Sequence, residues 1–278
     1  MSGHGNIAGR IILFVLLCIA VIWAFFPIVF MISSSFKPGG LIWAYPPKLI
    51  AEPTVSNYQN IANLFPRFWG SLFNSIIVTI LATVLTLTMA ITSAFVFSRL
   101  RQPWLKIPAF LMIFVRMFPS IIVVIPLYPV FNELGWLDTI TPLVLCGAAF
   151  AVSMATLLIK TFVDDIPVEL EEAAMIDGCS RAGAFARITL PLLRPAIAAV
   201  SLVVAIGSWN EYLFPLVFTS NDARTAPVII AIAMSNEDGV AWGGVMAMAT
   251  VYLAPPLLLV LMLHKQITNV MTMGAVKG

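Results

Sequence analysis

Four consecutive polar and aromatic residues, Trp209-Asn210-Glu211-Tyr212, interrupt an otherwise apolar segment at 195–218. The two aromatic rings offer stacking faces, and Asn210 and Glu211 offer hydrogen-bonding groups, which is the combination that a polyhydroxylated ligand requires. An aromatic belt at the membrane interface accounts for Trp209 and Tyr212 but leaves Asn210 and Glu211 unexplained. We therefore predict that this cluster contacts a solute or shapes its cavity.

Arg116 is a second ionisable residue inside an apolar stretch, and such charges are candidate functional sites. In a straight helix it would lie about nine residues, or roughly 13 Å, from the cytoplasmic end, whereas Glu211 would lie roughly 24 Å from that side. This separation excludes a direct ion pair unless the helices tilt or break. We favour a structural charge that snorkels or bonds carbonyls, with a place in the substrate pathway as the alternative.

Other chemistry finds no support in the sequence. No Gly-x-x-x-x-Gly-Lys-Ser/Thr segment occurs, so ATP would have to be hydrolysed by another chain. Cys18, Cys146 and Cys179 have no metal-ligand spacing, and His4 and His264 lie outside the apolar stretches. A net charge of +2 is too small to indicate nucleic acid. We expect no catalytic residue, metal or cofactor in this chain.

The composition indicates an integral membrane protein. The chain is 60% hydrophobic and only 10% charged, whereas soluble domains carry about 25% charged residues, so lipid must cover part of its surface. A membrane-spanning helix needs about 20 apolar residues. The stretches that qualify are 11–33, 72–97, 108–131, 140–162, 195–218 and 244–263. We predict an all-α fold with six transmembrane helices in a single domain, 1–278. The first stretch is too long for a signal peptide and lacks a convincing cleavage site.

The charges between these stretches predict the topology. With the N terminus inside, ten basic residues fall on the cytoplasmic side and four on the outer side, which satisfies the positive-inside rule. The ten are Arg10, Arg99, Arg101, Lys106, Lys160, Arg181, Arg187, Arg194, Lys265 and Lys277, and the four are Lys37, Lys48, Arg67 and Arg224. Both termini are therefore expected in the cytoplasm. The apolar run 226–234 is too short to span and is expected to be interfacial or re-entrant.

The cytoplasmic loop 163–194, called the elbow below, has the signals of two short helices. A first helix is expected from Val168 to Asp177, and Gly178 is placed to end it. Ser180 is placed to cap a second helix that runs from Arg181 to Leu190 and stops at Pro191.

Small side chains on the first helix predict a docking surface. Ala173 and Ala174 form a flat patch that another protein can approach closely. A helix resting on anionic lipid would carry a Lys/Arg-rich polar face. The first helix instead contains Glu169, Glu171 and Glu172. We therefore expect the elbow to bind a protein rather than lipid headgroups.

The order and spacing of these residues resemble a known motif. Glu172-Ala173-Ala174, three residues, Gly178, nine residues, Ile188, one residue and Leu190-Pro191 resemble the EAA loop of permease subunits of bacterial ABC importers. Shorter segments are similar to the carbohydrate branch, in particular to the second maltose permease subunit. These segments are Asn74-Ser75, Met117-Phe118-Pro119, 209–212 and 274–278.

The resemblance implies the type I importer permease fold in a bacterial inner membrane. It implies a second permease subunit, two ATPase subunits that bind ATP and magnesium, and an external solute-binding protein as partners. The ATPase-coupling residues would be Glu172, Ala173, Ala174, Asp177, Gly178, Ile188, Leu190 and Pro191, with an arginine of the ATPase as the mate of Glu172. The substrate pathway would include Trp209, Asn210, Glu211, Tyr212, Arg116 and Asn74.

Two other functions remain open from the sequence. A proton-coupled carrier would use Glu211 as its proton site, although it would not need the elbow and no clear inverted repeat is present. A membrane scaffold would bind an ATPase without moving a solute. Mono- and disaccharides, polyols and glycerol phosphates are all possible solutes. Neutral ones rank first, because phosphate recognition favours clustered basic residues and only Arg116 is available.

Overall fold

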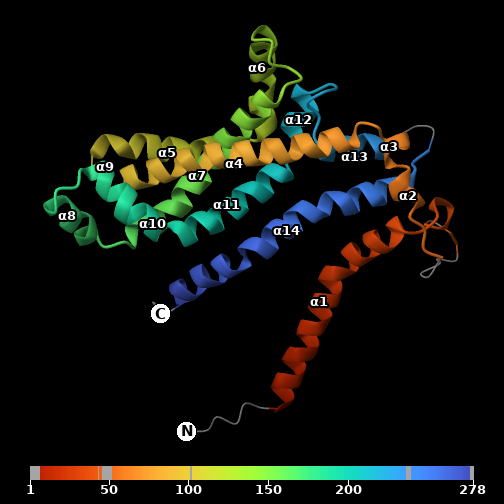
Figure 1. Cartoon of the computed structure of the whole chain (residues 1–278), viewed down its shortest axis with the longest axis horizontal. Coiled ribbons are helices and arrows are strands. Elements are labelled where there is room, and N and C mark those ends of the chain that lie inside the picture. Colours follow the sequence, from red (N-terminus) through yellow and green to blue (C-terminus); the bar gives the residue numbers. More distant parts are fainter. Residues whose placement is uncertain (1–6, 43, 46–51, 101, 236–238, 276–278) are drawn as a thin grey trace. The chain divides into compact units, whose positions relative to one another are not determined.

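The computed structural model describes residues 7–42, 44–45, 52–100, 102–235 and 239–275, with side chains described only within 9–263. Throughout these ranges the regular structure is helical, and no strand occurs in them (Figure 1). The chain forms two compact units, one made of Met1–Phe68 with Ile230–Leu253 and the other of Trp69–Ile229 with Ala254–Gly278. A single permease domain over 1–278 stays a prediction.

Among the described residues, four helices are long and apolar enough to cross a membrane. They are α1 (Ile7–Ser35), α4 (Phe68–Arg99), α7 (Ile140–Asp164) and α14 (Trp242–Ala275). Two bent pairs of helices pass the same test together, so the described chain has up to six spans. The first pair joins Pro103–Val115 to Ser120–Glu133 at 99°, and the second joins Arg181–Leu192 to Arg194–Trp209 at 72°. This confirms the all-α membrane fold.

The third predicted span is not one continuous helix. The short helix η2 (Pro103–Leu105) and α5 (Lys106–Val115) precede a break, and α6 (Ser120–Glu133) follows it. Proline disfavours the helical conformation of the residue before it, and Pro119 itself is extended, with a ψ of 133°. The straight-helix depth expected for Arg116 is therefore wrong, because Arg116 stands at the end of α5.

The fifth predicted span is also interrupted. Helix α11 (Arg194–Trp209) ends at the polar cluster, and α12 (Leu213–Phe218) begins again after it. The run 226–234, which is too short to span a membrane, forms the short helix α13 (Ala226–Met234).

Of the charged residues used to predict the topology, Lys48, Arg101 and Lys277 lie outside the described residues, as does the side chain of Lys265.

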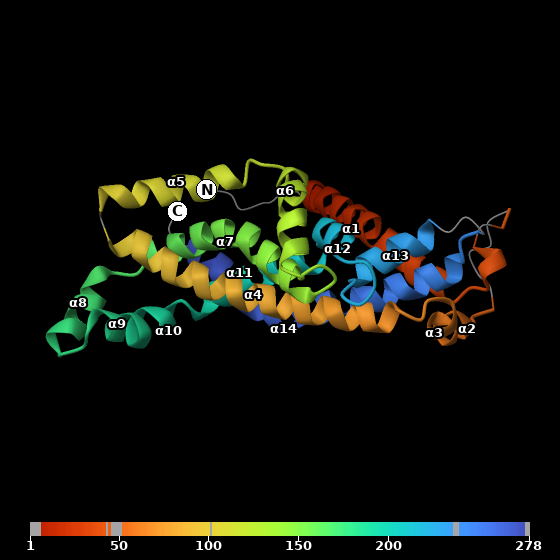
Figure 2. The same ribbon diagram turned by 90° about the horizontal axis from the view of Figure 1, so that it is seen from above.

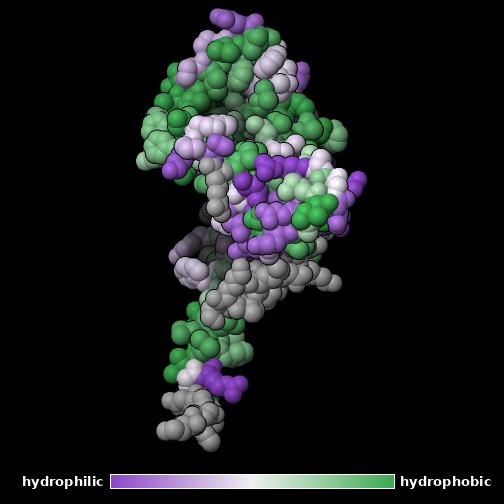
Figure 3. Space-filling model, turned by 90° about the vertical axis from the view of Figure 1, so that its left-hand side faces the viewer, coloured by the Kyte–Doolittle hydropathy of each residue, from purple (hydrophilic) through white to green (hydrophobic). Residues whose placement is uncertain are grey.

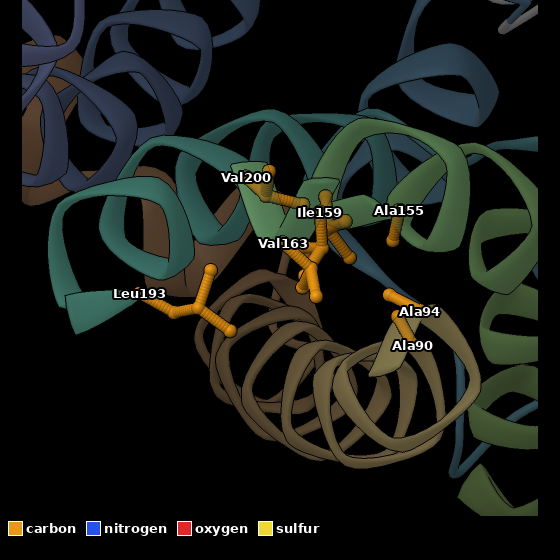
Figure 4. Close-up of a cluster of buried hydrophobic side chains, with 8 residues drawn as sticks. Ala90, Ala94, Ala155, Ile159, Val163, Leu193 and Val200 are labelled. Atoms are coloured by element: carbon orange, nitrogen blue, oxygen red, sulfur yellow. The ribbon is translucent and has the colours of Figure 1, made fainter. Parts of the chain in front are cut away.

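The larger unit is built around α7, which packs against α4 and α11 (Figures 1 and 2). Figure 4 shows their buried side chains meeting. Ala90 and Ala94 of α4 and Ala155 of α7 let the helix backbones approach closely, as small residues do in membrane proteins. The other labelled members of this cluster are Ile159, Val163, Leu193 and Val200.

The smaller unit contains α1, η1 (Gly39–Leu41), α2 (Ser56–Gln59), α3 (Ile61–Leu64) and the first part of α14. The Asn57 side chain ties its helices together by donating to the carbonyl oxygens of Ser35 and Lys37, at 2.8 Å each. The apolar side chains of α1 are mostly exposed. They require lipid or another protein to cover them.

Candidate functional site

The first helix of the elbow, α8 (Val168–Ile176), ends in a left-handed turn at Gly178, whose φ is +91°. The N–H of Gly178 donates to the carbonyl of Met175 at 3.1 Å, and that of Cys179 donates to the carbonyl of Ala174 at 2.9 Å. This pair of bonds is the Schellman motif, which satisfies the last carbonyls of a helix and favours glycine at the turn. The predicted helix end at Gly178 is thus present.

The second part of the elbow begins at the predicted cap. The Ser180 hydroxyl accepts a hydrogen bond from the N–H of Gly183 at 3.1 Å, at the start of α9 (Arg181–Ala184). The helical path continues through the wider π turn η3 (Phe185–Thr189) and α10 (Leu190–Leu192). The expectation that Pro191 stops this helix is wrong. Pro191 lies in the first turn of α10, where a missing N–H is tolerated.

The surface of α8 is mixed in chemistry. Glu172 and Ala173 are exposed, Ala174 is partly buried, and the apolar Ile176 is 86% exposed. Figure 3, which faces the side of the larger unit where α8 and α9 lie in Figure 1, shows a patch of hydrophilic side chains there. Of the other predicted coupling residues, Asp177 is exposed, whereas Ile188, Leu190 and Pro191 are partly buried behind the surface. Glu171, the acidic residue next to Glu172, is buried and faces inward.

A cavity of about 270 Å³ lies within the larger unit and brings Arg116 and Glu211 to one site. Its lining also includes Ala82 of α4, Gly147 and Phe150 of α7, and Ser208 of α11. Much of the wall is apolar, with the two ionisable side chains and one hydroxyl as polar groups. The breaks after α5 and α11 explain why residues that differ in depth on straight helices line the same cavity.

Glu211 lies in the break between α11 and α12 and caps the start of α12. Its Oε1 accepts hydrogen bonds from the N–H groups of Leu213 at 2.8 Å and Phe214 at 3.3 Å, which would otherwise lack partners at the start of α12. Within the described residues Oε2 makes no hydrogen bond. The carboxylate can therefore support the backbone and still offer an oxygen to a ligand.

The other three residues of the predicted cluster differ in burial. Trp209 is buried and lines a smaller neighbouring cavity together with Ser208 and Glu211. Asn210 and Tyr212 are exposed, and the Asn210 amide donates to the carbonyl of Ile206 at 3.0 Å. Neither of these two is among the residues that line the cavity of Arg116 and Glu211. Their contact with a solute stays a prediction.

Asn74 is engaged with the loop between α12 and α13. Its amide donates to the carbonyl oxygens of Asp222 at 2.7 Å and Arg224 at 3.0 Å. The neighbouring Ser75 hydroxyl accepts from the N–H of Ala226 at 2.9 Å. Asn74 is not part of the cavity lining, so its place in the pathway also stays a prediction.

Sequence reasoning missed Asp138, which fastens the other side of this loop. Its carboxylate accepts hydrogen bonds from the backbone N–H groups of four successive residues, 220–223, each at 3.1 Å. Burial by itself would raise the pKa of Asp138, but these N–H groups hold that pKa well below its usual range. Asp138 also has a φ of 57°, a conformation that aspartate tolerates better than most residues.

The described residues contain no group of three or more His, Cys, Asp or Glu side chains that could hold a metal ion. Residues 87–271 match the family described as binding-protein-dependent transport system inner membrane component. The chain belongs to this family. It is a multi-pass membrane permease, a transport subunit of an ABC importer.

Curated relatives match this permease over almost their whole length. The trehalose/maltose transport system permease protein MalG of Thermococcus litoralis is 33% identical, over 97% of each chain. The diacetylchitobiose uptake system permease protein DasC of Streptomyces coelicolor is 31% identical, over 91% of this chain and 92% of the relative. The trehalose transport system permease protein SugB of Mycobacterium tuberculosis is 32% identical, over 92% and 93%.

Solved structures share the fold. A chain of a bacterial ABC transporter involved in the import of the acidic polysaccharide alginate superimposes with a TM-score of 0.79 at 22% identity. The match covers 95% of this permease and 98% of that chain. A chain of an alginate ABC transporter in complex with an alginate pentasaccharide-bound periplasmic protein gives 0.65 at 16% identity. The fold is that of a type I importer permease.

Proposed function

We propose that this permease imports a neutral sugar or polyol, forming the membrane pathway together with a second, similar permease subunit. The observation that carries the proposal is the cavity that Arg116 and Glu211 share with an apolar and aromatic wall. Such a wall with a few polar groups suits a carbohydrate, and the relatives named above are permeases for trehalose, maltose and diacetylchitobiose. A single arginine among the lining residues favours a neutral solute over a phosphorylated one.

The elbow is the proposed site for the ATPase subunits. Ala173 has a small exposed side chain, so a partner surface can come close to the backbone of α8. Ile176 beside it offers apolar area that would gain from burial. Glu172 is the exposed acidic group, and an arginine of the ATPase is its proposed mate. The Schellman turn at Gly178 keeps this surface in one orientation.

The orientation in the membrane follows from the same assignment. An ATPase in the cytoplasm requires the elbow to be cytoplasmic, and the charge count places both termini on that side. The loop that Asn74 and Asp138 fasten would then lie on the outer face. A solute-binding protein delivers the solute to that face. The proposed location is the cytoplasmic membrane of a bacterium.

The test is uptake by the reconstituted complex. The two permeases and the ATPases are placed in proteoliposomes with ATP inside, and the solute-binding protein is added outside with radiolabelled maltose, trehalose or diacetylchitobiose. A thermal-shift screen of the binding protein selects the sugar. We expect uptake that requires ATP and the binding protein and continues when a protonophore is added. Uptake that the protonophore abolishes would indicate a proton-coupled carrier, and ATPase binding without any uptake would indicate a scaffold.

A further inference from the structure

A buried ion pair joins the end of α4 to the elbow. The Nε of Arg99 lies 2.9 Å from Oε1 of Glu171, and both side chains are only 7% exposed. The hydroxyl of Thr189 donates to the same Glu171 oxygen at 2.8 Å. Arg99 also donates from Nη2 to the carbonyl oxygen of Ile166 at 2.9 Å. The Arg99 guanidinium therefore contacts both Ile166, in the segment before α8, and Glu171 of α8. The hydrogen bond of Thr189 connects η3 to the same carboxylate.

The same arginine reaches the end of α7. Its Nη1 donates to the hydroxyl of Ser98 at 3.1 Å, and that hydroxyl donates to Oδ1 of Asp164 at 2.6 Å. Asp164 is also paired with Lys160 at 2.6 Å, through side chains that are 34% and 45% exposed. The Lys160 pair is open to solvent, where ion pairs contribute little. The buried part of the network is therefore its stiff part.

The two helices held in this way reach the cavity. Ala82 of α4 and Gly147 of α7 both belong to its lining. Between the cavity and the elbow, Ala90 and Ala94 of α4 pack against α7 in the buried cluster of Figure 4. A movement of the elbow can therefore be transmitted to the cavity wall through packed helices, provided that the contacts between Arg99 and the elbow stay intact.

We propose that Arg99, Glu171 and Thr189 form a rigid joint that transmits movement of the elbow to α4. Arg99 and Glu171 are positioning residues in this proposal, which rests on the proposed docking of the ATPase at the elbow. A buried ion pair adds little stability compared with apolar residues of similar volume. It does, however, restrict the joint to one arrangement, since any slip leaves a charge buried without its partner. Stiffness rather than stability is what transmission needs.

The test compares energy use with assembly in the reconstituted importer. The variant is the double substitution Arg99→Met with Glu171→Met, which removes both charges and keeps the joint filled. We expect it to retain its ATPase and to melt within about 4 °C of the wild type. The ATP hydrolysed per sugar imported should rise about fivefold or more, which is the lower end of typical coupling between sites. Lys160→Met, which breaks the solvent-exposed pair, is the matched control and should leave the ratio unchanged.

A second variant guards against failure of the first to assemble. Arg99→Lys keeps the charge beside Glu171 but cannot also make the Nη1 and Nη2 bonds to Ser98 and Ile166. It should raise the ratio as well, by a smaller factor. A wild-type ratio in an assembled double variant, or in Arg99→Lys if the double variant does not assemble, would overturn the proposal. Failure of the docking proposal is distinct, because the wild-type elbow itself would then not bind the ATPase.

Discussion

Replacing Gly178 should weaken docking of the ATPase by straining the turn of the elbow. The φ of +91° is one that residues with a Cβ rarely adopt, and the left-handed conformation costs them about 1–2 kcal/mol. A Cβ at Gly178 would meet no atom within 4 Å, so no steric clash adds to this cost. The expected penalty is therefore the backbone strain alone.

The expected loss of ATPase affinity depends on whether the strain can be relieved in the undocked elbow. In Gly178→Ala and Gly178→Val the free elbow can open the turn, and docking must close it again. A penalty of about 1–2 kcal/mol corresponds to a factor of about 5–30, which is the loss of ATPase affinity that we expect. Gly178→Asn should lose less, since asparagine tolerates the left-handed conformation. Gly70→Ala in α4 is the control, because its Cβ also meets open space but its backbone is helical.

The assay titrates the purified ATPase subunits onto the permease in detergent and follows solute-stimulated hydrolysis in parallel. The order of affinities should be wild type and Gly70→Ala together, then Gly178→Asn, then Gly178→Ala and Gly178→Val. Equal affinities for all five proteins would refute the reasoning, because a strained turn could not then be part of the docked elbow.

Three further predictions concern other parts of the permease. Asp138→Asn should destabilise the complex by about 1.5–3 kcal/mol by removing a charged acceptor of backbone N–H groups. Because the folded pKa of Asp138 is lowered, its contribution to stability is present above the unfolded pKa of about 3.9 and is lost as the pH falls further. The difference in melting temperature between this variant and the wild type should therefore be constant between pH 7 and 5 and should shrink below pH 4. Glu211→Gln, which keeps an acceptor for the N–H of Leu213, should assemble with its ATPase but lower uptake at least tenfold, about 1.4 kcal/mol in the rate-limiting step, whereas unchanged uptake kinetics would make Glu211 a helix cap only. A cysteine at Ser180 should resist an impermeant thiol reagent in intact cells, and labelling there would overturn the proposed orientation.

The elbow could be predicted closely because its signals are local. Gly178 and Ser180 act on backbone groups within a few residues of themselves, so their types and spacing are enough to place the turn and the cap. Pro191 was misjudged because a proline permits a helix start as readily as a stop, and the π turn before it is not written in any single residue. Local sequence patterns determine which helices form, while the residues at which these helices begin and end depend also on their surroundings in the fold.

The long-range contacts could not be predicted in the same way. Arg99 and Glu171 are 72 positions apart, and Asp138 meets a loop more than 80 positions away. Either carboxylate, seen in the sequence, fits a solvated loop or helix surface. The shared cavity of Arg116 and Glu211 was missed for a related reason, since breaks in two helices, rather than their lengths, set the positions of these residues.

Binding of the ATPase to an Ala173→Asp variant tests the central claim most directly. Ala173 is exposed on α8, so an aspartate there should not disturb the permease itself but would bring an unpaired charge into the docked surface. Ala173→Ser, which is small and uncharged, is the control. We expect the aspartate variant to insert normally and then to lose either the ATPase or the stimulation of hydrolysis by solute, while the serine variant keeps both. Normal ATPase retention together with normal stimulation in Ala173→Asp would contradict the assignment of the elbow as the element that couples ATP hydrolysis to import.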